Sequence, residues 1–232
     1  MKQIVSVAID GPAGAGKSTM ARAVAREMGF VYVDTGAIYR TLGYHFDFFG
    51  IGPKDVDNVT RLIDDANIEI RYSEDGVQHM LLNGHDVTDE IRTPAMSDFA
   101  SKLSTLKVVR DYLLDVQRSL AKKHSVVMDG RDIGTVVLPD ADVKIYLTAS
   151  AEVRARRRLL EFQAKGDKKS TFDAVLKDII QRDERDMNRE IAPLRQAEDA
   201  VLLDTSDLTV EESVRAMKEV IEKRLCETCS MD

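Results

Sequence analysis

Cysteine is almost absent from this chain of 232 residues. Its only two cysteines, Cys226 and Cys229, form a C-x-x-C pair near the C-terminus, without a second pair or a nearby histidine. The chain therefore lacks the residues for a disulfide framework or for a zinc site made of four cysteines. A redox pair or half of a zinc site is the alternative; we expect two reduced thiols in a frayed tail after a helix.

Other absences narrow the class of protein. No hydrophobic run is long enough to cross a membrane, and the N-terminus lacks the basic-then-apolar layout of a signal peptide. There are no repeats, no low-complexity tracts and only five prolines. The net charge of -7 disfavours a protein that coats nucleic acid. We expect a cytoplasmic α/β protein without nucleic-acid or membrane partners, built as one domain with large excursions.

Short apolar runs alternate with helical patterns along most of the chain. Such alternation predicts a parallel sheet covered by helices on both faces, with ligands beyond the carboxyl ends of the strands. Residues 17–28 have helical spacing, and Gly29 ends that helix. The runs expected to form strands are residues 3–9, 30–34, 125–129, 143–149 and 200–204.

Two segments depart from this alternation. Residues 56–104 begin with a short helix and continue with two alternating runs, joined by "SEDG" and followed by "NG", which predict a small antiparallel insertion. Residues 154–170 carry seven basic and two acidic side chains around Gly166. A charge run of this kind is usually a solvated helix face and a loop.

The segment "GPAGAGKS" matches the phosphate-binding pattern G-x-x-x-x-G-K-[ST] between a strand and a helix. Its backbone N–H groups and the helix dipole suit phosphate oxygens, Lys17 would reach the β- and γ-phosphates, and the Ser18 hydroxyl would bind Mg²⁺. A structural glycine turn is the alternative. The residues expected to bind ATP here are Gly11, Pro12, Ala13, Gly14, Ala15, Gly16, Lys17, Ser18 and Thr19.

A phosphate-binding loop serves switches, motors and kinases alike. The guanine-reading motif [NT]-K-x-D is absent, and so is a transporter signature of the LSGGQ type. A small-molecule kinase needs cations that hold an anionic acceptor in line with the γ-phosphate. The sequence offers such cations at the predicted ligand edge of the sheet.

Two motifs follow predicted strands and should therefore lie at that edge. In "DTGAIYR", Thr35 could cap the next helix, with Arg40 more than one turn along it; an ordinary helix start with a solvated arginine is the alternative. In "DGRDIGTVV", Arg131 and Asp132 place a cation beside an acceptor in a turn-rich loop. A salt-bridged structural turn is the alternative for the second motif.

A third motif, "QRDERDMNR", spaces Arg182, Arg185 and Arg189 by three and four residues, which predicts one helical face, with Asp186 beside them. The neighbouring acidic residues also fit a self-neutralising surface helix. We nevertheless interpret the arginines as candidate phosphate ligands, because a kinase needs a second anion site.

In order, spacing and total length, these motifs together with "IRT" and "APL" resemble the bacterial-type cytidylate kinases, which are P-loop nucleoside monophosphate kinases. The resemblance implies transfer of the γ-phosphoryl of ATP to CMP or dCMP, with Mg²⁺. It also implies a five-stranded parallel core, a monophosphate-binding domain with a small antiparallel sheet, and a mobile helical lid. The implied divisions are a core of residues 1–36, 105–152 and 190–232, an acceptor domain of residues 37–104, and a lid with its flanking helix of residues 153–189.

The resemblance also assigns residues to the two nucleotides. Arg40, Arg131 and Arg189 would clamp the acceptor and transferring phosphates, and Lys17, Arg131 and Arg189 would be the catalytic cations. Cytosine pairs an amine donor with a ring-nitrogen acceptor, which suits a carboxylate next to an arginine or hydroxyl. The residues implied for CMP are Thr35, Arg40, Ser101, Arg110, Arg131, Asp132, Arg182, Asp186 and Arg189, of which Ser101, Arg110 and Asp132 would read the base and Arg182 and Asp186 would hold the sugar.

The remaining expectations concern the lid, the metal and the rival functions. Arg158 would close over ATP, and Asp129 would orient the water shell of Mg²⁺ beside Ser18, unless it is an ordinary strand-end carboxylate. Ala13 and Thr35 stand where some relatives have serine, which leaves one hydroxyl contact open at each. Another monophosphate or shikimate-type kinase and a non-catalytic nucleotide sensor are the alternatives. We expect a monomer; the sequence does not set the CMP to dCMP preference.

Overall fold

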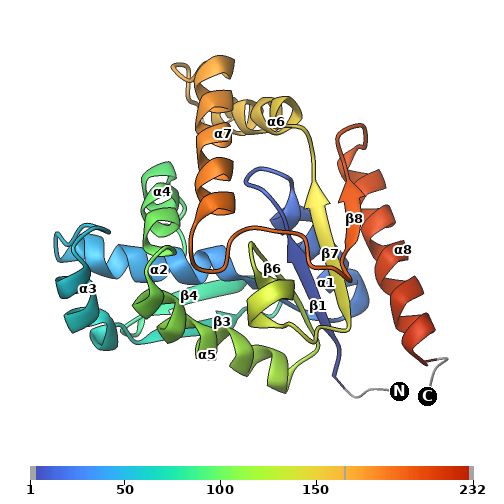
Figure 1. The fold of residues 1–232 in the computed structure, drawn as a ribbon, viewed down its shortest axis with the longest axis horizontal. Coiled ribbons are helices and arrows are strands. Elements are labelled where there is room, and N and C mark those ends of the chain that lie inside the picture. The colour runs from blue at the N-terminus through green and yellow to red at the C-terminus, as the bar shows by residue number, and fades with distance from the viewer. Residues whose placement is uncertain (1–3, 165, 230–232) are drawn as a thin grey trace.

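The computed structural model describes residues 4–164 and 166–229 and has a five-stranded parallel sheet at its centre (Figure 1). The strand order is β2-β6-β1-β7-β8. The strands are β1 (Ser6–Asp10), β2 (Val31–Asp34), β6 (Val126–Gly130), β7 (Val143–Thr148) and β8 (Val201–Asp204). All five predicted strands are confirmed. β1 begins at Ser6, whereas the predicted run began at Gln3, which lies outside the described residues.

Helices cover both faces of this sheet, as the alternating pattern predicted (Figure 1). α1 (Lys17–Met28) and α8 (Val210–Cys229) bury apolar side chains against one face, and α2 (Thr35–Phe48) and α5 (Lys107–Lys123) cover the other. The strands are largely apolar on both faces, as expected for a parallel sheet between two layers of helices, although Leu202 on the edge strand β8 is 56% exposed. This three-layer arrangement confirms the expected fold class.

The predicted antiparallel insertion is present and packs on α2. It consists of α3 (Val56–Leu62), β3 (Ile68–Tyr72), β4 (Gln78–Leu82), a two-residue β5 (His85–Asp86) and α4 (Pro94–Leu103). Its buried residues, among them Met80, Val87 and Ile91, belong to the same hydrophobic cluster as the α2 side chains Leu42 and Phe46. The insertion therefore shares its core with one face of the main sheet.

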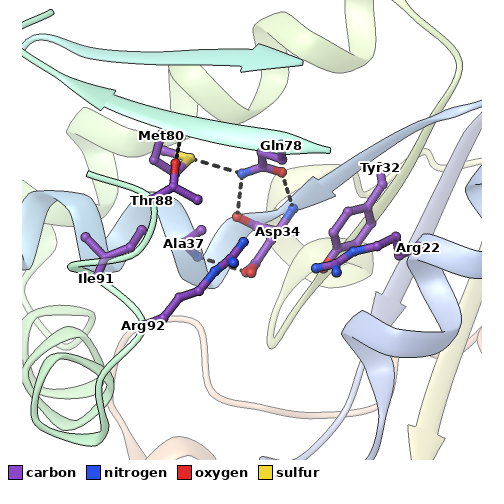
Figure 2. A pocket seen from close by; sticks show the side chains of 9 residues that line it. All are labelled: Arg22, Tyr32, Asp34, Ala37, Gln78, Met80, Thr88, Ile91 and Arg92. Carbon is purple, nitrogen blue, oxygen red and sulfur yellow. Dashed lines mark hydrogen bonds between the residues drawn. The ribbon is translucent and has the colours of Figure 1, made fainter. Parts of the chain in front are cut away.

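Side chains of the small sheet bind the open edge of β2 (Figure 2). The Gln78 Oε1 accepts from the Asp34 N–H at 2.8 Å, and its Nε2 donates to the Asp34 carbonyl at 3.4 Å. The Tyr72 hydroxyl donates to the Tyr32 carbonyl at 3.0 Å. An edge strand leaves backbone donors and acceptors without a ladder partner. Here side chains take the place of a sixth strand and fix the insertion to the core.

The helices α6 (Ala151–Ala164) and α7 (Phe172–Asn188) pack on each other around Ala155, Val175 and Ile179, a cluster separate from the two main cores. The basic run that begins at Arg154 lies largely on α6. Its interpretation as a solvated face is wrong at its start, because Arg154 is only 6% exposed. That side chain is buried because it makes polar contacts with the phosphate-binding loop.

The C-terminal helix is longer than the sequence suggested. α8 continues through Cys229, so the C-x-x-C pair lies in its last turn and not in a frayed tail after it. Cys226 is exposed there. Across residues 4–164 and 166–229, none of the helices has the length and hydrophobicity needed to span a membrane.

Candidate nucleotide site

The loop between β1 and α1 has the tight conformation of a phosphate cradle. A Cβ on Gly11 would lie 1.9 Å from the Leu147 carbonyl oxygen, so only glycine allows the loop to cross β7 this closely. Gly16 caps α1 with a φ of 88°, in the left-handed region. The loop thereby presents successive N–H groups and the positive end of α1 to one concavity.

Lys17, the first residue of α1, points back into this loop and is 5% exposed. Its ammonium donates to the carbonyls of Gly11 at 2.8 Å and Pro12 at 2.7 Å. Burial, followed by the positive charge of Arg131, lowers the pKa of Lys17 well below its usual value. The loop thus holds a desolvated cation that an anion would stabilise.

Ser18 faces Asp129 at the end of β6. The Ser18 hydroxyl donates to Asp129 Oδ2 and the Tyr32 hydroxyl to Oδ1, both at 2.9 Å. Burial, then the charge of Asp34, raises the pKa of Asp129 to about 6. Hydroxyl and carboxylate oxygens are what Mg²⁺ prefers, and it commonly takes one or two protein ligands alongside phosphates. Ser18 and Asp129 therefore fit the ion. Among the described residues, no group of three or more His, Cys, Asp or Glu side chains is arranged to hold a metal ion by itself.

Asp10 organises the segment after β6, a role that the sequence did not reveal. It ends β1, and its carboxylate accepts the N–H groups of Ile133 at 2.7 Å and Gly134 at 2.8 Å. These residues begin a π-helical turn, Ile133–Val137, directly after Arg131 and Asp132. Asp10 thus fixes where the turn starts and, through it, where those two side chains lie.

Asp10 should also make stability depend on pH. Burial raises its pKa to about 6, despite the two backbone hydrogen bonds. Because the folded pKa lies above the unfolded value, the stabilisation from protonated Asp10 is complete at low pH and declines as pH rises. Relative to Asp10→Asn, the wild type should lose about 1.4 kcal/mol of unfolding free energy per pH unit between about 4 and 6. Urea unfolding across this range measures the difference, and a pH-independent difference would contradict the assignment.

Asp34 and Arg40 form a pair at the start of α2. Asp34 is the N-cap of α2 and accepts the Ala37 N–H at 2.8 Å, so the expectation that Thr35 caps the helix is wrong. Thr35 is instead the first helical residue, and its hydroxyl donates to the Asp129 carbonyl at 2.7 Å. The Arg40 Nη2 bonds Asp34 Oδ2 at 3.0 Å, while its Nε is buried without a partner.

Arg131 and Asp186 meet between β6 and α7. The Arg131 Nε donates to Asp186 Oδ2 at 2.9 Å, and the Ser101 hydroxyl reaches Asp186 Oδ1 at 3.4 Å. Burial acts to raise the pKa of Asp186, but the charges of Arg131 and Arg182 hold it below its usual value. Three of the residues implied for CMP thus come together from three different elements.

Arg182 is the cation that the protein satisfies least. Its Nε is buried and has no hydrogen-bond partner. Burial lowers its pKa to about 10, and the positive charges of Arg131, Arg40 and Arg158 act in the same direction, opposed by Asp186. Arg182 thus lies within reach of three other guanidinium groups, and the opposing charge, Asp186, is already bonded to Arg131, so a further anion would reduce the repulsion.

Asp132 is shared between Arg110 of α5 and Arg189. Arg110 Nη2 donates to Oδ2 and Arg189 Nη2 to Oδ1, the latter at 3.1 Å. Arg189 also donates to the Ser104 hydroxyl at 3.2 Å. The expected base-reading residues Arg110 and Asp132 are in contact, while Ser101 lies with Asp186. Arg189 joins the Asp132 group, and its role as a phosphate clamp stays a prediction.

The three arginines of "QRDERDMNR" do not share one helical face, so that prediction is wrong. α7 ends at Asn188, and Arg189 continues with extended backbone toward Asp132. Arg185 turns to α4, where it donates to Asp98 at 3.0 Å and to the Ser101 hydroxyl at 3.3 Å. Of the three, only Arg182 lies near the guanidinium groups of Arg131, Arg40 and Arg158. Arg158 on α6 pairs with Glu161 at 3.0 Å and lies over the Phe162 ring.

The roles of Asp34 and Gln78 were not predicted from the sequence. Asp34 could have been found, since a carboxylate between a strand and a helix is a frequent N-cap. Gln78 could not, because nothing in the alternating run distinguishes it from a solvated side chain. Together with Arg22 and Arg92, these two residues line a small cavity beside the start of α2 (Figure 2).

This chain is similar to known proteins along nearly its whole length. A family model described as cytidylate kinase matches residues 7–223. The chain is 50% identical over 218 residues to a cytidylate kinase of Carboxydothermus hydrogenoformans, covering 94% of this chain and 97% of that protein. It is 47% identical over 223 residues to a cytidylate kinase of Caldicellulosiruptor saccharolyticus, covering 96% and 97%.

Solved structures share the fold at low sequence identity. An uncharacterized protein from Eubacterium ventriosum has a TM-score of 0.50 and 14% identity, covering 96% of this chain and 99% of that one. Similarity at this level supports the fold alone. The family match and the relatives go further, because they extend over nearly the whole chain. The chain belongs to the cytidylate kinase family.

Proposed function

We propose that this protein transfers the γ-phosphoryl group of ATP to CMP or dCMP, giving ADP and CDP or dCDP. The supporting observation is a set of cations that repel one another: Arg131 and Arg182 act to lower the pKa of Lys17, and Arg131 and Arg40 act to lower that of Arg182. A nucleotide sensor needs one anion site. A kinase needs two, and we propose that these cations hold the second anion next to the γ-phosphate. The family relatives support the same substrate class.

Catalysis in this proposal is positioning and electrostatic stabilisation. A phosphate oxygen of CMP attacks the γ-phosphorus, the bond to the β,γ-bridging oxygen breaks, and the electron pair leaves with ADP. The acceptor is already an anion, so no strong base is needed. Lys17, Arg131 and Arg189 offset the charge of the transferring group. Mg²⁺, bound at Ser18 with Asp129 acting through water, would neutralise the ATP phosphates.

We assign the acceptor contacts by chemistry. The Asp132 carboxylate accepts from the cytosine amine, and Arg110 and Ser101 supply donors to the ring nitrogen and carbonyl. Uracil would place a carbonyl against that carboxylate. Arg182 and Asp186 hold the sugar, with Asp186 accepting from a hydroxyl. Thr35, Arg40, Arg131 and Arg189 surround the CMP phosphate.

We further propose how the chain moves and where it works. Residues 37–104 form the acceptor domain and residues 153–189 the lid with its flanking helix, on a core of residues 1–36, 105–152 and 190–232. Closure of the lid brings Arg158 over ATP at residues 11–19 and excludes water, so the phosphoryl group goes to CMP. Because ATP and CMP are cytoplasmic metabolites, we place the enzyme there, acting as a monomer.

Arg40→Ala should weaken CMP far more than ATP. Arg40 lies in the second turn of α2 and bonds Asp34 rather than the phosphate-binding loop, and Asp34 itself caps the helix N-terminus. Losing one charged phosphate ligand should raise KM for CMP about 10- to 100-fold, with KM for ATP within about twofold. Steady-state kinetics with Arg61→Ala, an exposed arginine of α3, as control test this. Equal losses for both nucleotides would remove Arg40 from the acceptor site.

One assay tests the function as a whole. ADP release from Mg-ATP is measured with CMP, dCMP, UMP, AMP, GMP and shikimate, and without acceptor. We expect CMP and dCMP to give the highest kcat/KM. Preference for another acceptor would identify a different small-molecule kinase, and binding of ATP without ADP release would identify a sensor.

A further inference from the structure

Arg154 and Asp183 form a buried ion pair that the nucleotide site does not explain. Arg154 lies in the first turn of α6 and Asp183 in the second half of α7. They are 6% and 7% exposed, and Arg154 Nη1 is 2.6 Å from Asp183 Oδ2. An ion pair removed from water this completely is costly unless further hydrogen bonds satisfy it.

Those hydrogen bonds go to the backbone of Ala13 in the phosphate-binding loop. Arg154 Nη1 donates to the Ala13 carbonyl at 2.9 Å, and the Ala13 N–H donates to Asp183 Oδ1 at 3.3 Å. The two side chains therefore hold both backbone polar groups of Ala13. Arg154 Nε also donates to the Ala149 carbonyl at 2.8 Å, directly before α6.

This contact joins two parts of the protein that have separate apolar cores. The α6–α7 pair is organised around its own cluster of Ala155, Val175 and Ile179. A Cβ added at Gly14 would lie 3.5 Å from Arg154 Cβ and 3.8 Å from Ile179, so the loop rests against the base of this helical pair. A polar connection at that point can fix the loop while the tips of the helices move.

The pair also balances charge beside the cradle. Asp183 is a carboxylate bonded to the loop that would hold a polyanion, and its charge is felt as far as Arg131. Unpaired, it would repel the ATP phosphates; paired with Arg154, it supplies a hydrogen-bond acceptor without a net negative charge. An arginine suits this place because its planar fork can bind a carboxylate and a carbonyl together.

On the basis of the proposed function, we infer that Arg154 and Asp183 are positioning residues. They hold the base of the lid and Ala13 of the phosphate-binding loop in one arrangement for ATP. Arg154 also neutralises the charge of Asp183 next to the triphosphate. Neither side chain takes part in the chemistry.

The inference predicts an asymmetry between variants. Arg154→Met leaves a buried, unpaired carboxylate at the cradle and should weaken Mg-ATP binding about tenfold or more, equal to about 1.4 kcal/mol. Asp183→Asn keeps an oxygen for the Ala13 N–H and leaves no negative charge, so its effect should be smaller. The double variant Arg154→Met/Asp183→Asn should recover part of the loss. KM for CMP should change less than about twofold in all three.

A purely structural pair would behave differently. Removing both partners would then harm ATP binding at least as much as removing one. Calorimetric titration with Mg-ATP measures affinity without chemistry, and the ratio of ADP released without CMP to ADP released with CMP reports whether closure still excludes water. We expect this ratio to rise in Arg154→Met and to fall again in the double variant.

The matched control is Arg157→Met on the same helix. Arg157 donates to the Thr205 carbonyl at 2.7 Å and has no hydrogen bond to the phosphate-binding loop among the described residues. It should lower the unfolding temperature without raising the ADP ratio. If Arg154→Met does not fold, Arg154→Lys replaces it, since lysine keeps the charge but cannot bond Ala13, Ala149 and Asp183 together. Its ATP affinity should be measurably below that of wild type.

The outcomes separate the inference from the proposed function. If the wild type releases no ADP in response to CMP, the proposed function fails. If the wild type is active but the double variant binds ATP no better than Arg154→Met, or Arg154→Lys equals wild type, the inference is wrong while the function stands.

Discussion

Lys17→Ala is expected to lower kcat by about 10³-fold or more with the fold intact. The ammonium lies in the loop that would surround the β- and γ-phosphates and donates there to two carbonyls. In the transition state, these hydrogen bonds would go to phosphate oxygens. The alanine side chain offers neither the charge nor the donors.

The same substitution should cost little stability. Burial lowers the pKa of Lys17, which means that folding disfavours its charged form. The buried ammonium therefore lowers the free energy of unfolding, and removing it offsets the loss of its hydrogen bonds. Thermal unfolding of Lys17→Ala should therefore occur within a few degrees of wild type. Lys218→Ala is the control, since Lys218 pairs with Glu27 between α8 and α1, at 2.8 Å. Normal phosphoryl transfer by Lys17→Ala would refute the role given to the cradle.

Asp132→Asn is expected to abolish most of the discrimination between CMP and UMP. The carboxylate offers two acceptor oxygens, whereas an amide offers one acceptor and one donor, which pairs equally well with the uracil carbonyl. The ratio of kcat/KM for CMP to that for UMP should fall about 100-fold. Both values come from the same variant, so a loss of folded protein cancels from the ratio.

This variant should also lose stability, unlike Lys17→Ala. Arg110 and Arg189 are 7% and 9% exposed and share Asp132 as their counter-charge. Removing one partner of a buried ionic group typically costs about 3–5 kcal/mol. Asp140→Asn, at an exposed position after the π-helical turn, should change neither property. An unchanged CMP to UMP ratio in Asp132→Asn would exclude Asp132 from base recognition.

Much of the fold follows from local sequence patterns. The structure confirms the predicted strands, the glycine loop and the hairpin turns. They could be predicted because each depends on residues that are neighbours in the sequence. The ends of parallel strands gather at one edge, which is why Arg40, Arg131 and Lys17 could be placed near one another from sequence. The expectation for residues 154–170 failed at Arg154, because composition does not reveal which member of a charge run is buried.

The pairing of side chains in the site could not be predicted. Whether Arg131 bonds Asp132 or Asp186 depends on where α7 lies relative to β6, and tertiary packing sets that distance. Arg189 bonds Asp132 and does not share a helical face with Arg182, because α7 ends one residue before Arg189. Asp34, and not Thr35, is the N-cap of α2. Either side chain is a good cap, and the exact position of the strand–helix junction determines which one is used.

The side chains that cover β2 have a consequence for the solubility of this protein. Gln78 and Tyr72 occupy backbone groups that would otherwise attract a strand from another molecule. Removing the small sheet to obtain a minimal kinase would expose the backbone at the edge of β2. Such a shortened protein should form intermolecular β-structure and precipitate even where its remaining core can fold.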